Sequence, residues 1–308
     1  MQEKTFNFYD TTSLKSYNLD KSIRYQLNLL DTLDVYTRKH CENVASIVCR
    51  LCEYMHSSKS FTVYCTINAY LHDIGKLFIP FEVLQKPGAL TPEEYEIMKK
   101  HTTLGYNLCM KDLQLRPYAT GALYHHEALN GTGYPKGISL HDIPLEAQII
   151  AVADQFDAIV SKRQYKSHID ISEALKIIIA DTKPTKRFSS DEHEKVGKLN
   201  KLVVKKLLKV VLDDIYMEIT YTEDYVTELK NELSRFEQIE KYAQKMNSAK
   251  KEKDKNYYLD GIKLLLKKDE NLDNYKSIHN EYSDAYTMRK GMIEKLYDEI
   301  KIIKKLRV

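Results

Sequence analysis

The sequence predicts an all-α protein, and two observations support this. Apolar residues recur at the spacing of an amphipathic helix, as in Val44, Ile47, Val48, Leu51 and Met55. No segment combines the alternation of a half-buried strand with the turn residues of a hairpin. Helices are therefore the only regular elements that account for the apolar pattern.

The first two predicted helices each bring a polar residue to the interior. His40 shares the inward face of the first helix, which the stripe from Val44 to Met55 defines. The second helix has an apolar face within residues 63–71 and ends close to His72 and Asp73. Gly75 is its expected stop, because glycine is common just after the end of a helix.

The next helix has a well-defined start. Thr91 can cap it, Pro92 suits its first turn, and Glu94 can reach back to the cap. His101 lies further along the same predicted helix, on one face with Ile97. We therefore expect this histidine to point inward.

A later helix carries a buried stripe between residues 149 and 160, with Asp154 at its margin. A carboxylate beside Ile150 and Ala151 is costly to bury unless a cation or hydrogen bonds compensate for the lost solvation. Asp154 is therefore a candidate metal ligand.

The chain divides into three predicted parts. A polar segment at about 180–190 indicates a loop that ends the first domain. We expect an N-terminal extension at 1–30, a compact domain at 31–188 and a helical C-terminal region at 189–308.

The C-terminal region contains no motif that indicates chemistry. Its spacing predicts a helical hairpin or bundle, because a long coiled coil needs three or four sustained heptads. We expect a role in regulation or oligomerisation, including a homodimer through these helices. A basic stripe indicates a solvated face or, less favoured, a surface that steers an anionic partner; it comprises Lys198, Lys201, Lys205 and Lys209.

Composition and charge narrow the class of protein. The 47 basic residues are nearly matched by 44 acidic ones, and the formal net charge is only +3, so no nucleic-acid polymer is indicated as a partner. No long apolar stretch or signal peptide is present, which predicts a cytoplasmic protein without a membrane segment. Five cysteines without an export signal do not indicate a disulfide framework.

Most of the chemical information lies in histidines and aspartates that are distant in the sequence. Imidazole nitrogens and carboxylate oxygens, with no thiolate among them, suit a hydrolytic centre of iron, manganese or another borderline divalent metal. Structural zinc fits less well. The candidates are His40, His72, Asp73, His101, His125, His126 and Asp154.

The sequence contains an internal control for the His-Asp pair. Residues 71–74 and 140–143 share the letters LHDI, but only the first copy continues into Gly-Lys. The second copy runs into Pro144, so Asp142 is predicted to cap a helix and not to bind a metal.

A glycine-rich loop follows the adjacent histidines His125 and His126. Gly131 and Gly133 allow backbone angles that other residues avoid, and Pro135 fixes the exit from the loop. Such a loop is shaped for close approach to another group.

Taken together, these motifs resemble the HD-GYP family of bacterial cyclic-dinucleotide phosphodiesterases, a branch of the HD phosphohydrolases. The resemblance covers about Asp34 to Tyr165 and depends most on two segments, YLHDIGK and HHEALNGTGYPKG. It implies an HD-domain helical bundle with the C-terminal helices as an appendage. It also implies two divalent metal ions, Fe or Mn, and a cyclic dinucleotide substrate.

The resemblance assigns the ligands to two metals. The first would be held by His40, His72, Asp73 and Asp154, and the second would share Asp73. The remaining ligands of the second metal would be His101, His125 and His126.

Two departures from the family pattern are visible. Some members hold a third metal through a glutamate four residues before the first histidine, where this chain has Tyr36, so two metals are expected. The segment KPTKRFSSDEHEK interrupts the usual end of the domain, which leaves the predicted ligands intact.

Other residues are candidates for catalysis and substrate contact. Asp73 and Lys76 are the expected catalytic residues, with Lys76 able to neutralise charge on the phosphoryl oxygens. Arginine can grip two phosphate oxygens at once. The expected substrate contacts are Lys76, Gly133, Tyr134, Pro135, Arg163 and Lys166.

The resemblance implies hydrolysis of cyclic di-GMP to pGpG by water that the two cations activate, and it leaves open whether pGpG is hydrolysed further to GMP. A cyclic GMP-AMP substrate stays open because the motifs do not identify the bases. A further alternative is a receptor or scaffold that binds the dinucleotide, or a diguanylate cyclase, without turnover. A general nucleotide phosphohydrolase is less favoured, since it needs neither the His125-His126 pair nor the Gly-Tyr-Pro loop.

Overall fold

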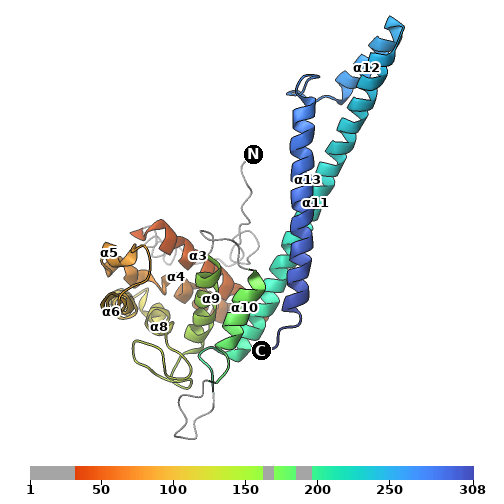
Figure 1. Ribbon diagram of the computed structural model, residues 1–308. Helices are drawn as coiled ribbons and strands as arrows, with labels where there is room; N and C mark the ends of the chain where they lie inside the picture. Colours follow the sequence, from red (N-terminus) through yellow and green to blue (C-terminus); the bar gives the residue numbers. More distant parts are fainter. Residues whose placement is uncertain (1–31, 162–169, 185–195) are drawn as a thin grey trace. The chain divides into compact units, whose positions relative to one another are not determined.

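The computed structural model describes residues 32–161, 170–184 and 196–308, and within them it contains only helices and connecting segments (Figure 1). One isolated bridge pairs Asn130 with Ser139. The predicted all-α class is confirmed. The chain forms two compact units, Met1–Leu212 with Ile302–Val308, and Asp213–Lys301.

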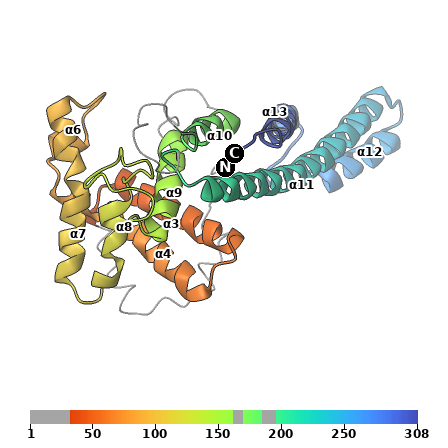
Figure 2. The same ribbon diagram turned by 90° about the horizontal axis from the view of Figure 1, so that it is seen from below.

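The first unit is built around α3 (Val35–Tyr54) and α4 (Lys59–Leu71), which pack against each other and against α9 (Leu145–Ser161) (Figure 2). Asp34 caps α3 by accepting hydrogen bonds from the backbone N–H groups of Tyr36 and Thr37, both at 3.1 Å. The predicted inward stripe of α3 is fully buried at Val44, Val48 and Leu51. Each such side chain contributes about 1.5–3 kcal/mol by leaving water.

The segment after α4 differs from the expected simple helix end. The helix ends at Leu71, and a short 3-10 helix, η3 (Ile74–Phe78), follows Asp73. Gly75 lies inside η3, where a Cβ atom would be 1.9 Å from the backbone oxygen of His101. Gly75 is therefore required for contact between η3 and the next helices, and it does not act as a helix stop.

The predicted capping box is present at the start of α6 (Pro92–Lys99), after the short helix α5 (Phe81–Leu84). Thr91 Oγ1 accepts from Glu94 N at 3.3 Å, and Thr91 N donates to the Glu94 carboxylate at 2.7 Å. The helix expected to continue to His101 instead breaks at Lys100, and His101 opens α7 (His101–Lys111). Because of this break, the direction in which the His101 side chain points is not set by the α6 helix.

The remaining elements of this unit are η4 (Arg116–Tyr118), α8 (Ala119–Tyr124) and α10 (Ile171–Ala180). The α4 helix is tied to α8 because Asn68 Oδ1 accepts from the backbone N–H of Gly121 at 2.9 Å. Buried Glu146 of α9 accepts hydrogen bonds from the hydroxyls of Tyr64 and Thr120, both at 2.9 Å. These polar contacts fix the helices that surround the site.

The second unit contains most of α11 (Lys201–Ser248), α12 (Glu252–Leu265) and most of α13 (Tyr275–Ile303). Its core cluster comprises Phe236, Ile239, Ile262 and Tyr275. Arg235 ties the unit further by donating to both oxygens of Glu270, at 2.6 and 2.7 Å.

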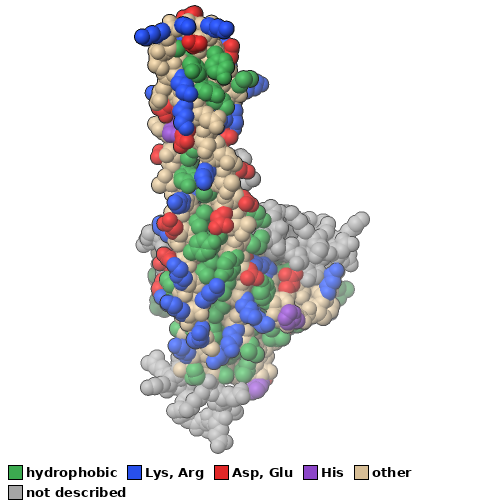
Figure 3. Space-filling model, turned by 90° about the vertical axis from the view of Figure 1, so that its right-hand side faces the viewer, with side chains coloured by type: hydrophobic (Ala, Val, Ile, Leu, Met, Phe, Trp, Pro, Cys, Tyr) green, Lys and Arg blue, Asp and Glu red, His purple; other side chains and the backbone are tan. Residues whose placement is uncertain are grey.

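An apolar stripe at the start of the C-terminal region is buried; it comprises Leu199, Val203, Leu207, Val211 and Ile215. The parallel basic stripe at Lys198, Lys201, Lys205 and Lys209 is exposed. Figure 3 shows lysine and arginine side chains on the viewed face, interspersed with hydrophobic and acidic ones. This distribution agrees with a solvated helix face.

The predicted boundary at 188/189 lies outside the described residues, whereas the compact units divide within α11, between Leu212 and Asp213. The three-part organisation stays a prediction. Among the helices of residues 32–161, 170–184 and 196–308, none is long and apolar enough to cross a bilayer.

We predict that Gly75→Ala destabilises the first unit, because the added Cβ would meet the backbone of His101 at 1.9 Å and of Gly105 at 2.5 Å. The expected loss in the free energy of unfolding is about 1–3 kcal/mol, measurable by urea denaturation. Gly291→Ala is the matched control, because a Cβ there meets nothing within 4 Å. An unchanged denaturation curve for Gly75→Ala would contradict the packing role of this glycine.

Candidate metal centre

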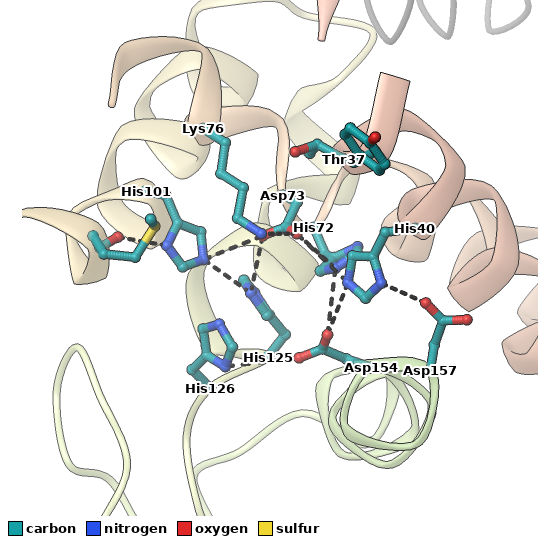
Figure 4. A network of polar contacts seen from close by, with 12 residues as sticks. Thr37, His40, His72, Asp73, Lys76, His101, His125, His126, Asp154 and Asp157 are labelled. Carbon is teal, nitrogen blue, oxygen red and sulfur yellow. Dashed lines mark hydrogen bonds and ion pairs between the residues drawn. The ribbon is translucent and has the colours of Figure 1, made fainter. Parts of the chain in front are cut away.

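The first group of candidate ligands combines His40 of α3 with His72 and Asp73, which follow α4 (Figure 4). The Nε2 atoms of His40 and His72 lie 3.6 and 3.4 Å from Asp73 Oδ2. The side chains of His72 and Asp73 are 0% and 2% exposed. Ligand atoms this close and this buried have the arrangement that a metal ion requires.

The second group combines His101, the first residue of α7, with His125 and His126, which follow α8. The Nε2 atoms of His101 and His125 are 3.2 Å apart. The rings of His125 and His126 are also in contact, with centroids 4.1 Å apart. The break at Lys100 and the end of α8 thus bring three imidazoles from two elements to one place.

Asp73 lies between the two groups. Its Oδ2 faces His40 and His72, whereas its Oδ1 lies 3.4 Å from His101 Nε2 and 3.9 Å from His125 Nε2. One carboxylate therefore presents one oxygen to each group (Figure 4). This arrangement is suited to a bridging ligand.

Asp154 of α9 adds a second carboxylate to the site. Its Oδ1 lies 3.0 Å from His40 Nε2 and 4.0 Å from His72 Nε2, and its Oδ2 lies 3.8 Å from His126 Nδ1. All seven residues predicted as metal ligands thus converge in one place.

The orientation of four imidazoles is fixed by hydrogen bonds from their Nδ1 atoms. His40 donates to Asp157 Oδ2 at 2.7 Å, and His72 donates to the carbonyl of Ala69 at 2.6 Å. His101 and His125 likewise donate to backbone carbonyls, at 2.7 and 2.9 Å. Because Nδ1 donates to these acceptors, the Nε2 atom of each ring points toward the centre.

The electrostatic environment differs between the two groups of histidines. Burial lowers the pKa of His101, lowers that of His125 well below 6.5, and lowers that of His126 to about 3. Burial also opposes the charge on His40, but hydrogen bonds with Asp154 and Asp157 raise its pKa to about 9. Burial likewise opposes the charge on His72, but the carboxylate of Asp73 raises its pKa well above 6.5. The second group is therefore neutral near pH 7, whereas His40 and His72 hold protons that a metal ion would replace.

These observations together test whether a cation fits the site. The buried His72 Nε2 and Asp73 Oδ1 make no hydrogen bond of normal geometry. Neutral His101 and His125 also direct two lone pairs at each other across 3.2 Å. Buried polar atoms without a hydrogen-bond partner, and facing lone pairs without a donor, are costly. A divalent cation satisfies all of them, so the residues fit a metal.

Lys76 of η3 contributes a positive charge at the edge of this site. Its Nζ lies 2.5 Å from Asp73 Oδ2, and its side chain is 21% exposed. Burial acts against the charge, but Asp73 raises the pKa of Lys76, so the ammonium group stays protonated near neutral pH. Its side chain reaches toward the carboxylate between the two histidine groups (Figure 4).

The glycine-rich loop packs against the second group. Gly133 is required because a Cβ there would lie 2.3 Å from the backbone nitrogen of Ala128. The Tyr134 ring stacks on His126, with centroids 4.7 Å apart, and the Tyr134–Pro135 peptide bond is cis. The predicted loop is therefore next to the candidate ligands.

Buried Glu127 binds the residues at the C-terminal end of this loop. Its two carboxylate oxygens accept from the backbone N–H groups of Lys136 and Ile138, at 2.7 and 3.1 Å. The C-terminal end of the loop is thus anchored by two hydrogen bonds.

Other predicted residues do not add to the described site. Arg163 and Lys166 lie outside the described residues. The second His-Asp pair, His141 and Asp142, is exposed and belongs to neither candidate ligand group, as the missing Gly-Lys indicated.

Asp157 is a residue of the site that was not among the predicted ones. Its carboxylate accepts from His40 Nδ1 at 2.7 Å and from Asn43 Nδ2 at 3.1 Å. A usable signal existed, because Asp157 lies three residues after Asp154 and so shares its face of an otherwise largely apolar helix.

A model of the HD domain family matches residues 24–186, more than half of the chain. The chain therefore belongs to the HD domain family. This match covers every candidate metal ligand described above.

Several curated proteins are similar to about half of the chain. A cyclic di-GMP phosphodiesterase of Thermotoga maritima is 45% identical over 157 residues, which cover 49% of this chain and 42% of that protein. A cyclic di-GMP phosphodiesterase response regulator of Xanthomonas campestris pv. campestris is 40% identical over 147 residues, 47% of this chain and 39% of that protein. The 3'3'-cGAMP-specific phosphodiesterase 3 of Vibrio cholerae is 34% identical over 150 residues, 49% of this chain and 33% of that protein.

These relatives confirm the resemblance to the HD-GYP cyclic-dinucleotide phosphodiesterases. The chain spans less than half the length of each of them.

We predict that Asp157→Asn weakens metal binding, because the amide can no longer hold the Nδ1 proton of His40 as a carboxylate does. Loss of such a supporting hydrogen bond lowers metal affinity about 10- to 100-fold, which titration with metal and analysis of metal content would measure. Asp142→Asn is the control, since Asp142 is exposed. Equal metal affinities in the two variants would show that Asp157 does not orient His40.

Proposed function

We propose that this chain is a metal-dependent phosphodiesterase that hydrolyses cyclic di-GMP to pGpG and onward to GMP. The observation that carries the proposal is the buried carboxylate of Asp73, whose two oxygens face two groups of imidazoles with ring nitrogens directed inward. The relatives named as cyclic di-GMP phosphodiesterases support the choice of substrate.

The proposed ligands follow the two groups. One metal would be held by His40, His72, Asp73 and Asp154. The other would share Asp73 and be held by His101, His125 and His126. Iron or manganese is proposed for both, because nitrogen and carboxylate ligands without thiolates suit these metals.

When bound, two such cations polarise the phosphoryl oxygens and lower the pKa of the attacking water. The protein residues supply orientation and charge. Lys76, 2.5 Å from Asp73, would place its ammonium group against a phosphoryl oxygen and stabilise negative charge there as the ester bond breaks. Buried His72 and His125 line a site from which bulk water is largely excluded.

The substrate contacts are also proposals. Tyr134, stacked on His126, presents an aromatic face next to the second group of histidines. Gly133 and Pro135 hold this ring in place as parts of the anchored loop. Arg163 and Lys166 are proposed as phosphate contacts on the family resemblance.

A cyclic GMP-AMP is the second candidate substrate. The observation in its favour is the similarity to a relative named as a 3'3'-cGAMP-specific phosphodiesterase. Hydrolysis rates for cyclic di-GMP and cyclic GMP-AMP, measured side by side, would decide between them. A receptor without turnover is less favoured, since no predicted ligand has been lost.

The expectations for larger partners stay predictions. They are a homodimer through the C-terminal helices and a complex with a diguanylate cyclase. The structure gives the fold of these helices and no contact that tests either assembly.

We predict that Asp73→Ala abolishes hydrolysis of cyclic di-GMP, because both metals lose their shared ligand. Chromatography of the products formed by metal-loaded protein would measure this. Asp73→Asn keeps the size of the side chain and separates loss of charge from loss of packing, and Asp142→Ala is the exposed control. Turnover that survives Asp73→Ala would refute the proposed mechanism.

We also predict that chelation removes the activity and that anaerobic Fe(II) or Mn(II) restores it. The buried histidine and aspartate atoms would regain their cation, so the thermal midpoint should rise on reloading as well. Activity and thermal unfolding of the stripped and reloaded protein would be compared. Magnesium, which prefers oxygen ligands, is the control cation and should restore little of either.

A further inference from the structure

A row of aromatic rings leads away from the second group of histidines. The His126 ring contacts Tyr134 at 4.7 Å between centroids, with the rings inclined by 32°. Tyr134 in turn meets Tyr95 of α6 edge to face, at 6.2 Å. Tyr95 is 47% exposed. The row therefore begins at the candidate ligands and ends at an accessible aromatic side chain.

Lys99 adds a positive charge to the same place. Its Nζ lies 5.4 Å from the centroid of Tyr95 and 5.8 Å from that of Tyr134. Both distances are within the range of cation–π attraction. The Lys99 Nζ also forms an ion pair with Glu96 Oε1, at 2.6 Å. Lys99 is thus fixed beside the two tyrosine rings.

The position of Tyr95 is poorly explained by packing alone. The α6 helix has no buried residue, so the hydrophobic core gains little from a tyrosine there. The helix precedes α7 directly, and the first residue of α7 is the candidate ligand His101. A ring on α6 is therefore held at a defined distance from the candidate metal centre.

We propose that Tyr95 is the surface on which one purine base of the cyclic dinucleotide stacks, and that Lys99 is a positioning residue for this ring. The inference rests on the proposed function and adds the base-recognition part of the site. When a phosphodiester group of the substrate lies at the histidines, the base of the attached nucleotide is one sugar away from that group. This base would then lie next to the row of rings. Base stacking tolerates any purine, because every base has an aromatic face.

The charge of Lys99 has a second effect on a substrate of this kind. A cyclic dinucleotide carries two phosphates, and only one can be at the metal centre. A fixed ammonium group beside the stacked base attracts the rest of the anion. Tyr95 would therefore contribute through its flat ring, and Lys99 through ring orientation and charge.

The test uses the metal-loaded full chain and a cyclic dinucleotide that carries 2-aminopurine, whose fluorescence is quenched when the base stacks on an aromatic ring. Tyr95→Ala should reduce the quenching and weaken binding roughly tenfold. Tyr95→Phe, which keeps the ring, should retain both. Tyr221→Ala, at a tyrosine of α11 that is 58% exposed, is the matched control.

Kinetics with cyclic di-GMP give an independent measurement. Tyr95→Ala and Lys99→Met should each raise KM several-fold and leave kcat and metal content close to those of the unchanged protein. Lys111→Met, at an exposed lysine of α7, is the control for removal of a positive charge.

The outcomes separate this inference from the proposed function. Quenching and KM that are unchanged in Tyr95→Ala would overturn the stacking role, and so would a loss of metal that accounts for the whole effect. Binding of the analogue without hydrolysis of cyclic di-GMP would overturn the proposed activity, while the quenching would still decide the role of Tyr95. No binding by the unchanged protein would overturn both.

Discussion

The site depends on the buried carboxylate of Asp73, whose two oxygens face two separate groups of imidazoles. A buried anion is costly unless positive charge or hydrogen-bond donors surround it. Lys76, His40 and His72 supply positive charge around Asp73, because the pKa values of both histidines are raised. His101 and His125 are neutral near pH 7 and direct lone pairs into the site. Divalent cations at the two groups would replace the protons of the first and satisfy the lone pairs of the second.

The backbone around Asp73 is shaped by close packing. Gly75 allows η3 to approach the backbone at His101, and the break at Lys100 lets α7 begin with that histidine at the site. Gly133 lets the loop close against the backbone that follows His126, which places Tyr134 on the histidine ring. At Gly75 and at Gly133, the lack of a side chain permits a contact that fixes a functional residue.

The two groups of histidines differ in how they would bind a metal. Burial keeps the second group neutral, so its imidazoles are ready to act as ligands. His40 lies between Asp154 and Asp157, which favour its protonated form. Metal binding at the first group therefore has to displace a proton, whereas binding at the second does not. The supporting carboxylate of Asp157 holds His40 in the correct orientation for this exchange.

The sequence by itself determined the helical class, the start of α6 at Thr91 and Pro92, and all seven candidate ligands. These features follow from helical period, capping and ligand chemistry, which are local properties of the chain. It also separated the His72-Asp73 pair from its exposed copy at 141–142, through the residues that follow each. Only the tertiary structure revealed the break at Lys100, the packing role of Gly75, and the support that Asp157 gives to His40. The physical reason is that these features depend on distances between segments far apart in the chain, such as the 117 positions between His40 and Asp157.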